Sequence, residues 1–265
     1  MFVRNLGHEA DVATLPNKHP GLKPSCLVYN NTKVLIDITI DFAKQLDAGE
    51  VEELNGILIT HCHQDAIGGI PKFNEGLKYL GKTVPLYALS KNINIIRHKY
   101  SERSLSQFEF KPFKNYTTFK LGDLQIKPLY VFHDKNFPTT AYNINAIFFY
   151  CADFGLPEGW EKDYEIGFFS NNLLAIIDGA YWDNQIPLNN HIAIIPHFND
   201  VMKLNNRFTY LTGYGNQWGD LEEAQKILDK LLLKYKRDNP DTKVKAIKIV
   251  KDNQEFDLAE LKKED

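Results

Sequence analysis

The feature that most constrains this chain is a short apolar segment that runs directly into a loop of metal-binding side chains. The segment Gly56–Thr60 is a run typical of a buried strand, and the next five residues, 61–65, read His-Cys-His-Gln-Asp. Alternate residues of an extended segment point the same way, so the imidazoles of His61 and His63 can approach one metal ion together. The carboxylate of Asp65 can join them or hydrogen-bond beside them. Zinc favours such ligands and, in catalytic sites, leaves one position for water.

The flanks of this loop favour a metal site over a pair of surface histidines. A bare His-x-His pattern more often marks exposed residues, but here the strand before it is apolar. Gly68 and Gly69 follow it and permit a close backbone approach and an unusual turn. Cys62 lies between the two histidines and points the opposite way, so we expect it to pack in the core rather than to act as a nucleophile.

The remainder of the chain alternates strands with helices, an order that suits two packed sheets with helices outside. There is no repeat, low-complexity segment or linker, so we expect one domain over residues 1–265. Strands are predicted at 26–29, 33–37, 56–60, 84–88, 108–110, 117–119, 124–132, 145–152, 173–177, 208–212 and 244–250, and helices at 42–46, from about 71, at 91–99, 191–202 and 221–235.

Composition narrows the class of protein. The net charge of −3 does not steer the chain broadly toward nucleic acid or membrane. The cysteines Cys26, Cys62 and Cys151 lie far apart without a Cys-x-x-Cys pair, which favours a reducing compartment and no disulfide framework. There is no signal-peptide pattern, and no apolar run approaches the ~18 residues of a membrane span. We therefore expect a soluble cytoplasmic protein.

The loop and its surroundings resemble a known signature. Thr60-His61-x-His63-x-Asp65-x-x-Gly68-Gly69 is similar to the motif of the metallo-β-lactamase superfamily. Later segments agree in order, namely 128–133 with the third metal histidine, 149–157 with a bridging aspartate, and 210–215 where the family has Leu-Thr-His. The resemblance covers nearly the whole chain and is closest to the phosphodiesterase branch, which includes ribonuclease Z. It implies an α/β fold, a four-layer αββα sandwich, with Asp37 in a structural role.

The resemblance also implies the metal ligands. The first ion of the family takes the equivalents of His61, His63 and His133, and the carboxylate of Asp153 bridges to the second ion. One zinc ion with three histidines and an aspartate is sufficient for a hydrolytic centre, because bound zinc lowers the pKa of water to about 7.

The second ion of the family would take Asp65, the residue after it, and the last histidine of the motif. Here those last two positions hold Ala66 and Gly213, which offer no side-chain ligand. Two carboxylates, Asp65 and Asp153, are a weak set for zinc on their own. We therefore expect one zinc ion and the loss of the second site, unless His191 or His197 substitutes for the missing histidine.

Histidines and carboxylates outside the first metal site are further candidates for catalysis. Besides Asp65, we assign His191 as a candidate, since a histidine near this point in the phosphodiesterase branch protonates the leaving group; an exposed histidine at a helix start is an equal alternative. Asp178 is as much a loop-stabilising carboxylate as a catalytic one. The histidines expected at the surface are His8, His19, His98 and, as a structural or surface residue, His197.

Three functions remain open from the sequence. The first is a zinc hydrolase acting on a small-molecule or nucleotide phosphodiester or a related ester. The second is a non-catalytic descendant that binds a nucleotide-like ligand or a partner in the same cleft. The third is an iron oxygenase with His61, His133 and Asp153 as a facial triad, which the retained His63 fits less well. Charge does not indicate a nucleic-acid partner, no membrane partner is expected, and a homodimer is left open.

Overall fold

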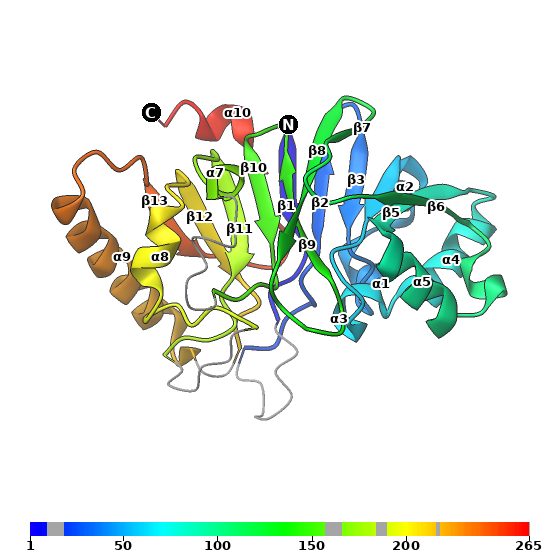
Figure 1. Ribbon diagram of the computed structural model, residues 1–265, viewed down its shortest axis with the longest axis horizontal. Coiled ribbons are helices and arrows are strands. Elements are labelled where there is room, and N and C mark those ends of the chain that lie inside the picture. The colour runs from blue at the N-terminus through cyan, green and yellow to red at the C-terminus, as the bar shows by residue number, and fades with distance from the viewer. Residues whose placement is uncertain (10–18, 157–165, 184–189, 216–217, 265) are drawn as a thin grey trace.

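Two seven-stranded sheets form the centre of the computed structural model, which describes residues 1–9, 19–156, 166–183, 190–215 and 218–264 (Figure 1). The first sheet has the order β14 (Gln254–Asp257), β1 (Phe2–Asn5), β2 (Cys26–Tyr29), β3 (Lys33–Ile36), β4 (Gly56–Leu58), β5 (Val84–Leu89) and β6 (Phe108–Phe113). The second has the order β13 (Ala246–Ile249), β12 (Phe208–Thr212), β11 (Leu174–Asp178), β10 (Phe148–Cys151), β9 (Thr139–Ile144), β8 (Leu124–Val131) and β7 (Phe119–Leu121).

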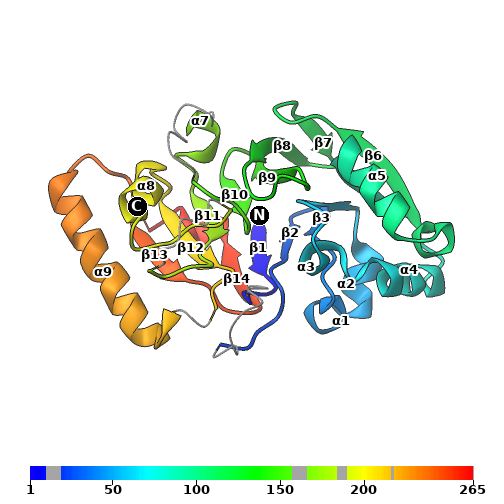
Figure 2. The same cartoon turned by 60° about the horizontal axis from the view of Figure 1, so that its bottom comes forward.

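Helices cover the outer face of each sheet, so the chain has the expected α/β sandwich of four layers (Figure 2). The first sheet is flanked by α1 (Phe42–Gln45), α2 (Ala48–Glu53), α3 (Gln64–Ile67), α4 (Ile70–Tyr79) and α5 (Ser90–Lys99), followed by the short η1 (Glu102–Leu105). The later part of the chain contributes α7 (Ile166–Phe169), α8 (Phe198–Lys203), α9 (Leu221–Asp238) and α10 (Leu258–Leu261). In the described part of the chain, no helix combines the length and the apolar character needed to cross a bilayer.

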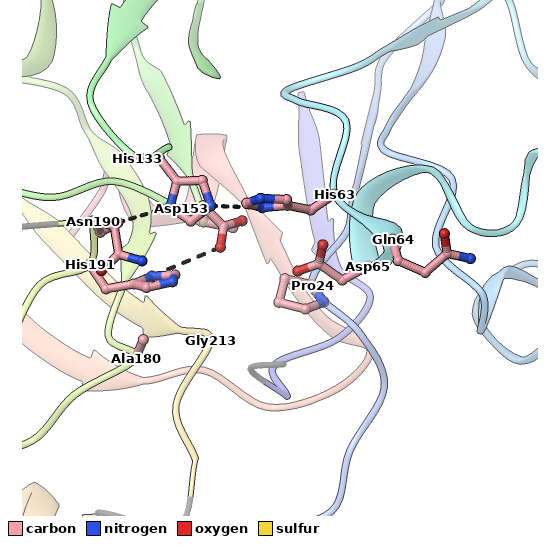
Figure 3. Close-up of a pocket in the computed structure, with 11 residues that line it drawn as sticks. Pro24, His63, Gln64, Asp65, His133, Asp153, Ala180, Asn190, His191 and Gly213 are labelled. Carbon is pink, nitrogen blue, oxygen red and sulfur yellow. Dashed lines mark hydrogen bonds and ion pairs between the residues drawn. The ribbon is translucent and has the colours of Figure 1, made fainter. Parts of the chain in front are cut away.

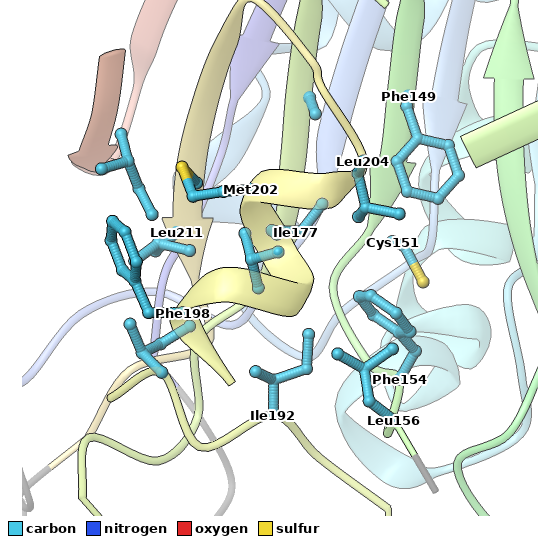
Figure 4. Close-up of a cluster of buried hydrophobic side chains, with 14 of the residues drawn as sticks. Phe149, Cys151, Phe154, Leu156, Ile177, Ile192, Phe198, Met202, Leu204 and Leu211 are labelled. Atoms are coloured by element: carbon cyan, nitrogen blue, oxygen red, sulfur yellow. The ribbon is translucent and has the colours of Figure 1, made fainter. Parts of the chain in front are cut away.

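Three apolar clusters hold these layers together. One lies between the sheets and joins Val34 and Leu58 of the first to Ile126 and Phe148 of the second. Another joins the first sheet to α4 and α5. The third packs α8 and α9 on the second sheet, with Ile177, Phe198, Met202 and Leu211 among its buried side chains (Figure 4). Each fully buried side chain of this size contributes roughly 1.5–3 kcal/mol, so the clusters fix the relative position of the layers.

The direction of the strands brings several loops to one edge of the molecule. In the first sheet β3 to β6 run parallel, and in the second β10 to β13 run parallel. β8 is antiparallel to β9, which is antiparallel to β10, so β8 points the same way as β10. Loops that leave the carboxyl ends of such strands gather along one edge, where ligands bind in open α/β sheets.

The structure shifts two of the expected strands and adds one that was not expected. The strand predicted at 117–119 is β7, two residues later. The strand predicted at 145–152 begins only at Phe148, because Asn145 and Ala146 adopt positive φ in a turn. β9, which precedes that turn, was not predicted because its sequence is partly polar. The residues of β9 are nevertheless buried, and the Tyr142 hydroxyl, for example, donates a 2.6 Å hydrogen bond to the Ile59 carbonyl.

The helix predicted at 191–202 is wrong in its first half. α8 begins at Phe198, and residues 191–195 instead run beside Tyr181. The Tyr181 backbone N–H donates to the Ile192 carbonyl, and the Ile194 N–H donates to the Tyr181 carbonyl. Pro196, whose ring is not compatible with a helix interior, separates this loop from α8.

Candidate metal centre

Six side chains with metal-binding atoms meet where strands of both sheets end, and Figure 3 shows all of them except His61. The first sheet supplies His61, His63 and Asp65, which follow β4. The second sheet supplies His133 after β8, Asp153 after β10 and His191 in the loop beyond β11. Three groups of these residues have potential ligand atoms within 4.8 Å of one another, namely His61, His63 and His133; His133, Asp153 and His191; and His61, Asp65 and Asp153.

The three histidines of the first group each have one ring nitrogen turned away from the centre and contacted by an oxygen. Nδ1 of His133 lies 2.8 Å from the Asn190 carbonyl, which only accepts, so this nitrogen carries the proton. Nε2 of His63 lies 3.5 Å from the Asp134 carboxylate. The outward nitrogens are thus oriented by acceptors, as the ligands of a metal ion usually are.

His61 is oriented through a relay of hydrogen bonds. The Thr60 hydroxyl donates to Asp37 Oδ2 at 2.7 Å, and the Thr60 backbone N–H donates to Asp37 Oδ1 at 2.8 Å. With its own proton engaged, the hydroxyl oxygen accepts from His61 Nδ1 at 2.9 Å. Burial raises the pKa of Asp37 above its usual range, while the bonds from Thr60 lower it. Asp37 thus has the structural role expected for it.

The inward nitrogens of the three histidines face one another. Nδ1 of His63 and Nε2 of His133 are 3.0 Å apart, close to the separation of about 3.3 Å between two ligands of a tetrahedral zinc ion. Among the described residues, Nε2 of His61 is buried without a hydrogen-bond partner. Burial and the neighbouring imidazoles hold the pKa of His61 well below its usual value, and burial likewise lowers the pKa of His133. Imidazole nitrogens that converge in this way fit a metal cation.

Two carboxylates face these histidines. Oδ1 of Asp65 lies 3.9 Å from His61 Nε2, and Asp65 also accepts the backbone N–H of Ala66 at 3.0 Å. Burial, together with the charge of Asp65, raises the pKa of Asp153 to about 8. A cation placed between the two carboxylates and the histidines would offset this repulsion.

His191 lies across the cavity from Asp65 and is held by Asp178. Its Nδ1 lies 2.6 Å from Asp178 Oδ2 and 4.0 Å from Asp153 Oδ1. Burial lowers the pKa of His191, but the charge and hydrogen bond of Asp178 outweigh it, with Asp153 and Asp65 adding to the effect, and raise the pKa to about 9. Asp178, which is fully buried, also accepts the backbone N–H groups of Phe154 and Ala180. It therefore stabilises a loop and orients His191.

These side chains surround a cavity of about 300 Å³. Figure 3 shows the carboxylates of Asp65 and Asp153 and the rings of His63, His133 and His191 around it, whereas the Gln64 side chain points away. The remaining lining comes from Pro24, Gln64, Ala152, Ala180, Asn190 and Gly213. The cavity is at the small end of the range for small-molecule sites.

A family model described as the beta-lactamase superfamily domain matches residues 32–240, which include the loop 61–65 and all the other residues of the cluster. The chain belongs to the metallo-β-lactamase superfamily. No curated protein sequence is significantly similar to it.

Solved structures share this metallo-β-lactamase fold over nearly the whole chain. A diphosphatase from the PhnP family has a TM-score of 0.73 at 20% identity and covers 97% of each chain. The metallo-β-lactamase fold protein YhfI from Bacillus subtilis has a TM-score of 0.73 at 16% identity, covering 96% of this chain and 98% of its own. The short form of human tRNase Z has a TM-score of 0.64 at 14% identity, covering 97% and 99%. At these identities the likeness establishes the fold.

The two departures from the metallo-β-lactamase motif lie in different surroundings. Ala66, in α3, is 3% exposed and packs in the apolar cluster under the first sheet. Gly213 lines the cavity with φ at +70°, and an added Cβ would meet the Ala152 carbonyl oxygen at 3.5 Å. A side chain at position 213 thus has room but would adopt a strained backbone.

Asp134 and Asn190 support the site without having been predicted from the sequence, and His8 differs from its expected exposure. Asp134 directly follows His133, and this adjacency was an available signal, whereas the carbonyl of Asn190 carried none. Cys62 is buried, as expected. His8, expected at the surface, is buried instead, because its Nδ1 contacts Asp252 at 2.5 Å and its ring stacks on Tyr214.

Proposed function

We propose that this protein is a metal-dependent hydrolase of the phosphodiesterase type that uses a single zinc ion. The ion would be held by His61, His63 and His133, with Asp153 as a fourth ligand. One observation carries the proposal, namely that the inward nitrogens of the three histidines converge while each outward nitrogen is contacted by an oxygen. A zinc ion bound there would lower the pKa of a coordinated water to about 7 and so supply a nucleophile near neutral pH.

The carboxylate of Asp65 would orient that nucleophile. Asp65 lines the cavity and lies 3.9 Å from His61 Nε2, on the side of the first sheet. An acceptor in this place aligns the attacking oxygen and receives a proton from it, as a general base does. This assigns Asp65 to catalysis rather than to a second ion.

His191 would deliver a proton to the leaving oxygen from the other side of the cavity. Its Nδ1 is bound to Asp178, which fixes the ring and favours the protonated form. A protonated imidazole facing the cavity is suited to act as a general acid when an ester bond breaks. The two candidate proton carriers, Asp65 and His191, would therefore act on opposite sides of the substrate.

The substrate class rests on the neighbours of this fold. They include a protein described as a diphosphatase, one described as a tRNase Z and a yeast protein described as PDE1. We infer a phosphodiester or related phosphate ester, and a second ion site that is degenerate because Ala66 and Gly213 provide no ligand. Three free, buried cysteines agree with a reducing, cytoplasmic location.

Elemental analysis and turnover of a chromogenic diester, bis(p-nitrophenyl) phosphate, test the proposal together. We expect about one zinc per chain, and we expect His63→Ala to lose both the zinc and the turnover. His197→Ala serves as the control, because His197 lies outside the cavity and contacts Asp200. Protein that binds no zinc on addition would overturn the proposal.

The alternative is a non-catalytic protein that binds a nucleotide-like ligand in the same cavity. The loss of both imidazoles at positions 66 and 213 favours it, since two-metal relatives use both ions to clamp the reacting phosphate. Zinc bound without turnover of any phosphate ester, combined with saturable binding of a nucleotide that His63→Ala abolishes, would select this alternative.

A further inference from the structure

A second pocket lies at the open end of the sandwich, away from the metal cluster. It is lined by β5, β6, β7 and the segment between β6 and β7, and has a volume of about 530 Å³. β6 is the last strand of the first sheet and β7 is the last strand of the second, and Figure 2 shows them beside each other. We call this hollow, lined by Tyr87, Phe113, Phe119 and three lysines, the β6–β7 pocket.

Aromatic rings form one wall of the β6–β7 pocket. The rings of Tyr87 and Phe119 stack 5.0 Å apart at 10°, and those of Phe113 and Phe119 stack 5.7 Å apart at 21°. Phe113 is buried, whereas Tyr87 and Phe119 are half-buried, so parts of these two rings remain available to a ligand. Because these rings stack on one another, a further flat ring can pack against the parts of the Tyr87 and Phe119 rings that remain exposed.

Positive charge borders this aromatic face. Lys111, Lys114 and Lys120 line the pocket, and Lys111 is paired with Glu109. Within the described residues, no acidic side chain lies at ion-pair distance from Lys114 or Lys120, and both are exposed. The net charge of the whole chain is −3, so this is a local concentration of cations on a chain that is otherwise slightly acidic.

The pocket opens at the same edge of the first sheet as the loop 61–65. β4, β5 and β6 are parallel, and the pocket is reached at the carboxyl ends of β5 and β6. Thr140 connects the two places, since its backbone N–H donates to the Thr60 carbonyl at 3.0 Å and its hydroxyl donates to Asn115 at 3.4 Å. Asn115 directly follows Lys114, and Thr60 directly precedes His61, so two hydrogen bonds of Thr140 link the neighbour of a pocket residue to the neighbour of a cluster residue.

We propose that the β6–β7 pocket binds a nucleotide, with the base packed against the exposed parts of the Tyr87 and Phe119 rings and the phosphate beside Lys114 and Lys120. Flat aromatic rings recognise a base, and lysines recognise a phosphate, so the two features together select a ligand that carries both. The ligand is either a free mononucleotide or a nucleotide at the end of a polynucleotide. The inference concerns binding outside the cavity and does not depend on the proposed hydrolysis.

Calorimetric titration of the full chain with adenosine 5′-monophosphate tests the site. We expect saturable binding that the double variant Lys114→Ala/Lys120→Ala weakens on the order of tenfold. The matched control is Lys72→Ala/Lys78→Ala, which removes the same charge from two exposed lysines of α4 and should leave the affinity unchanged. Adenosine and ribose 5-phosphate should each bind more weakly than the nucleotide.

Phe119→Leu tests the contribution of the base to binding separately from that of the phosphate. It keeps apolar volume but removes the ring, and we expect it to weaken nucleotide binding by about tenfold while leaving ribose 5-phosphate unaffected. Thermal melting shows whether this variant remains folded. A short oligoadenylate distinguishes the two sources, because tighter binding than the mononucleotide indicates a polynucleotide end and equal binding indicates the free nucleotide.

Two results would overturn the inference. One is the absence of saturable nucleotide binding by the wild-type chain. The other is equal binding by the wild-type chain and Lys114→Ala/Lys120→Ala, which would mean that these lysines only protect exposed sheet edges from pairing.

Discussion

The two sides of the metal cavity differ in how their side chains are supported. On the first-ion side, His61, His63 and His133 are each contacted by an acceptor, and the relay behind His61 reaches a buried aspartate. On the other side, position 66 is an apolar core residue and position 213 is a glycine with positive φ. This other side keeps the carboxylates of Asp65 and Asp153, together with His191, which Asp178 holds beside Asp153.

The difference predicts that the two sides of the cavity bind a cation with different strength. An outward ring nitrogen left without an acceptor inside a protein costs about 1–3 kcal/mol, so the acceptors behind the three histidines hold their rings in place. Conversely, an alanine in a packed cluster needs no such acceptor. The comparison therefore predicts one strong ion site and one absent site. Substitutions on either side of the cavity can test it.

The largest expected effect comes from restoring the missing imidazoles. Ala66→His/Gly213→His should raise the zinc content from about one to about two ions per chain, because an imidazole at position 213 would line the cavity with Asp65 and Asp153, and one at position 66 would directly follow Asp65. Elemental analysis measures the content, and diester turnover should rise with it. The control Ala66→His/Gly213→Ala introduces the same backbone strain with one imidazole fewer. Were the first variant to hold no more zinc than this control, the missing histidines would not account for the absent site.

The next largest effect is expected at Asp37, the last residue of the hydrogen-bond relay behind His61. Asp37→Ala leaves the buried N–H and hydroxyl of Thr60 without their acceptor and places a Cβ-bearing residue without a polar side chain at φ 65°. We expect a loss of about 3–5 kcal/mol in the free energy of unfolding, measured by urea titration.

Asp37→Asn is the matched variant for this position. Asparagine tolerates the left-handed backbone and keeps one acceptor oxygen, so it should lose clearly less stability than the alanine variant. If the two variants were equally unstable, the charge of Asp37 rather than its hydrogen bonds would be the stabilising feature.

A smaller effect is expected at Asp134, which contacts His63 Nε2. Asp134→Asn should lower zinc affinity by roughly 10- to 100-fold, the usual consequence of changing a group that orients a metal ligand. Competition with a chromogenic chelator measures the affinity directly, without reference to turnover. The exposed Asp241 provides the control variant Asp241→Asn. An unchanged affinity for Asp134→Asn would show that His63 needs no orienting partner.

The smallest effect lies at Gly213 itself. Gly213→Ala should cost about 1–2 kcal/mol, since φ at +70° is unfavourable for any residue with a Cβ while the surrounding space admits one. Gly215→Ala, two residues on, has open space and no positive φ and should change stability by less than about 0.5 kcal/mol. Equal melting temperatures for the two variants would remove backbone strain as a reason for the glycine at 213.

Sequence reasoning located the candidate ligands because they follow strands. His61, His63 and Asp65 come directly after an apolar run, and the resemblance placed His133 and Asp153 after later runs. The structure brings all five together with His191, which was a candidate although its surroundings were expected to be helical. The layers were likewise predictable, because apolar periodicity marks which faces are buried.

The supporting contacts were not predictable, since they depend on distant parts of the chain. The carbonyl of Asn190 meets His133 across 57 positions, and His8 meets Asp252 across 244. No local pattern indicates that His8 is buried. Asp178 was ambiguous for the same reason, because its three hydrogen bonds arise only when β10, β11 and the loop at 191 are packed together.

The origin of the ligands in both sheets has a further consequence for folding. His61 and His63 belong to the first sheet, and His133 and Asp153 to the second, so an ion bound by all four would join the two halves of the sandwich. Separation of the halves would then release the ion. At a free ion concentration a hundred times the dissociation constant, this linkage would add about 2.7 kcal/mol to the stability of the native state. The cation would thus act as an internal cross-link whose strength follows the metal supply of the cell.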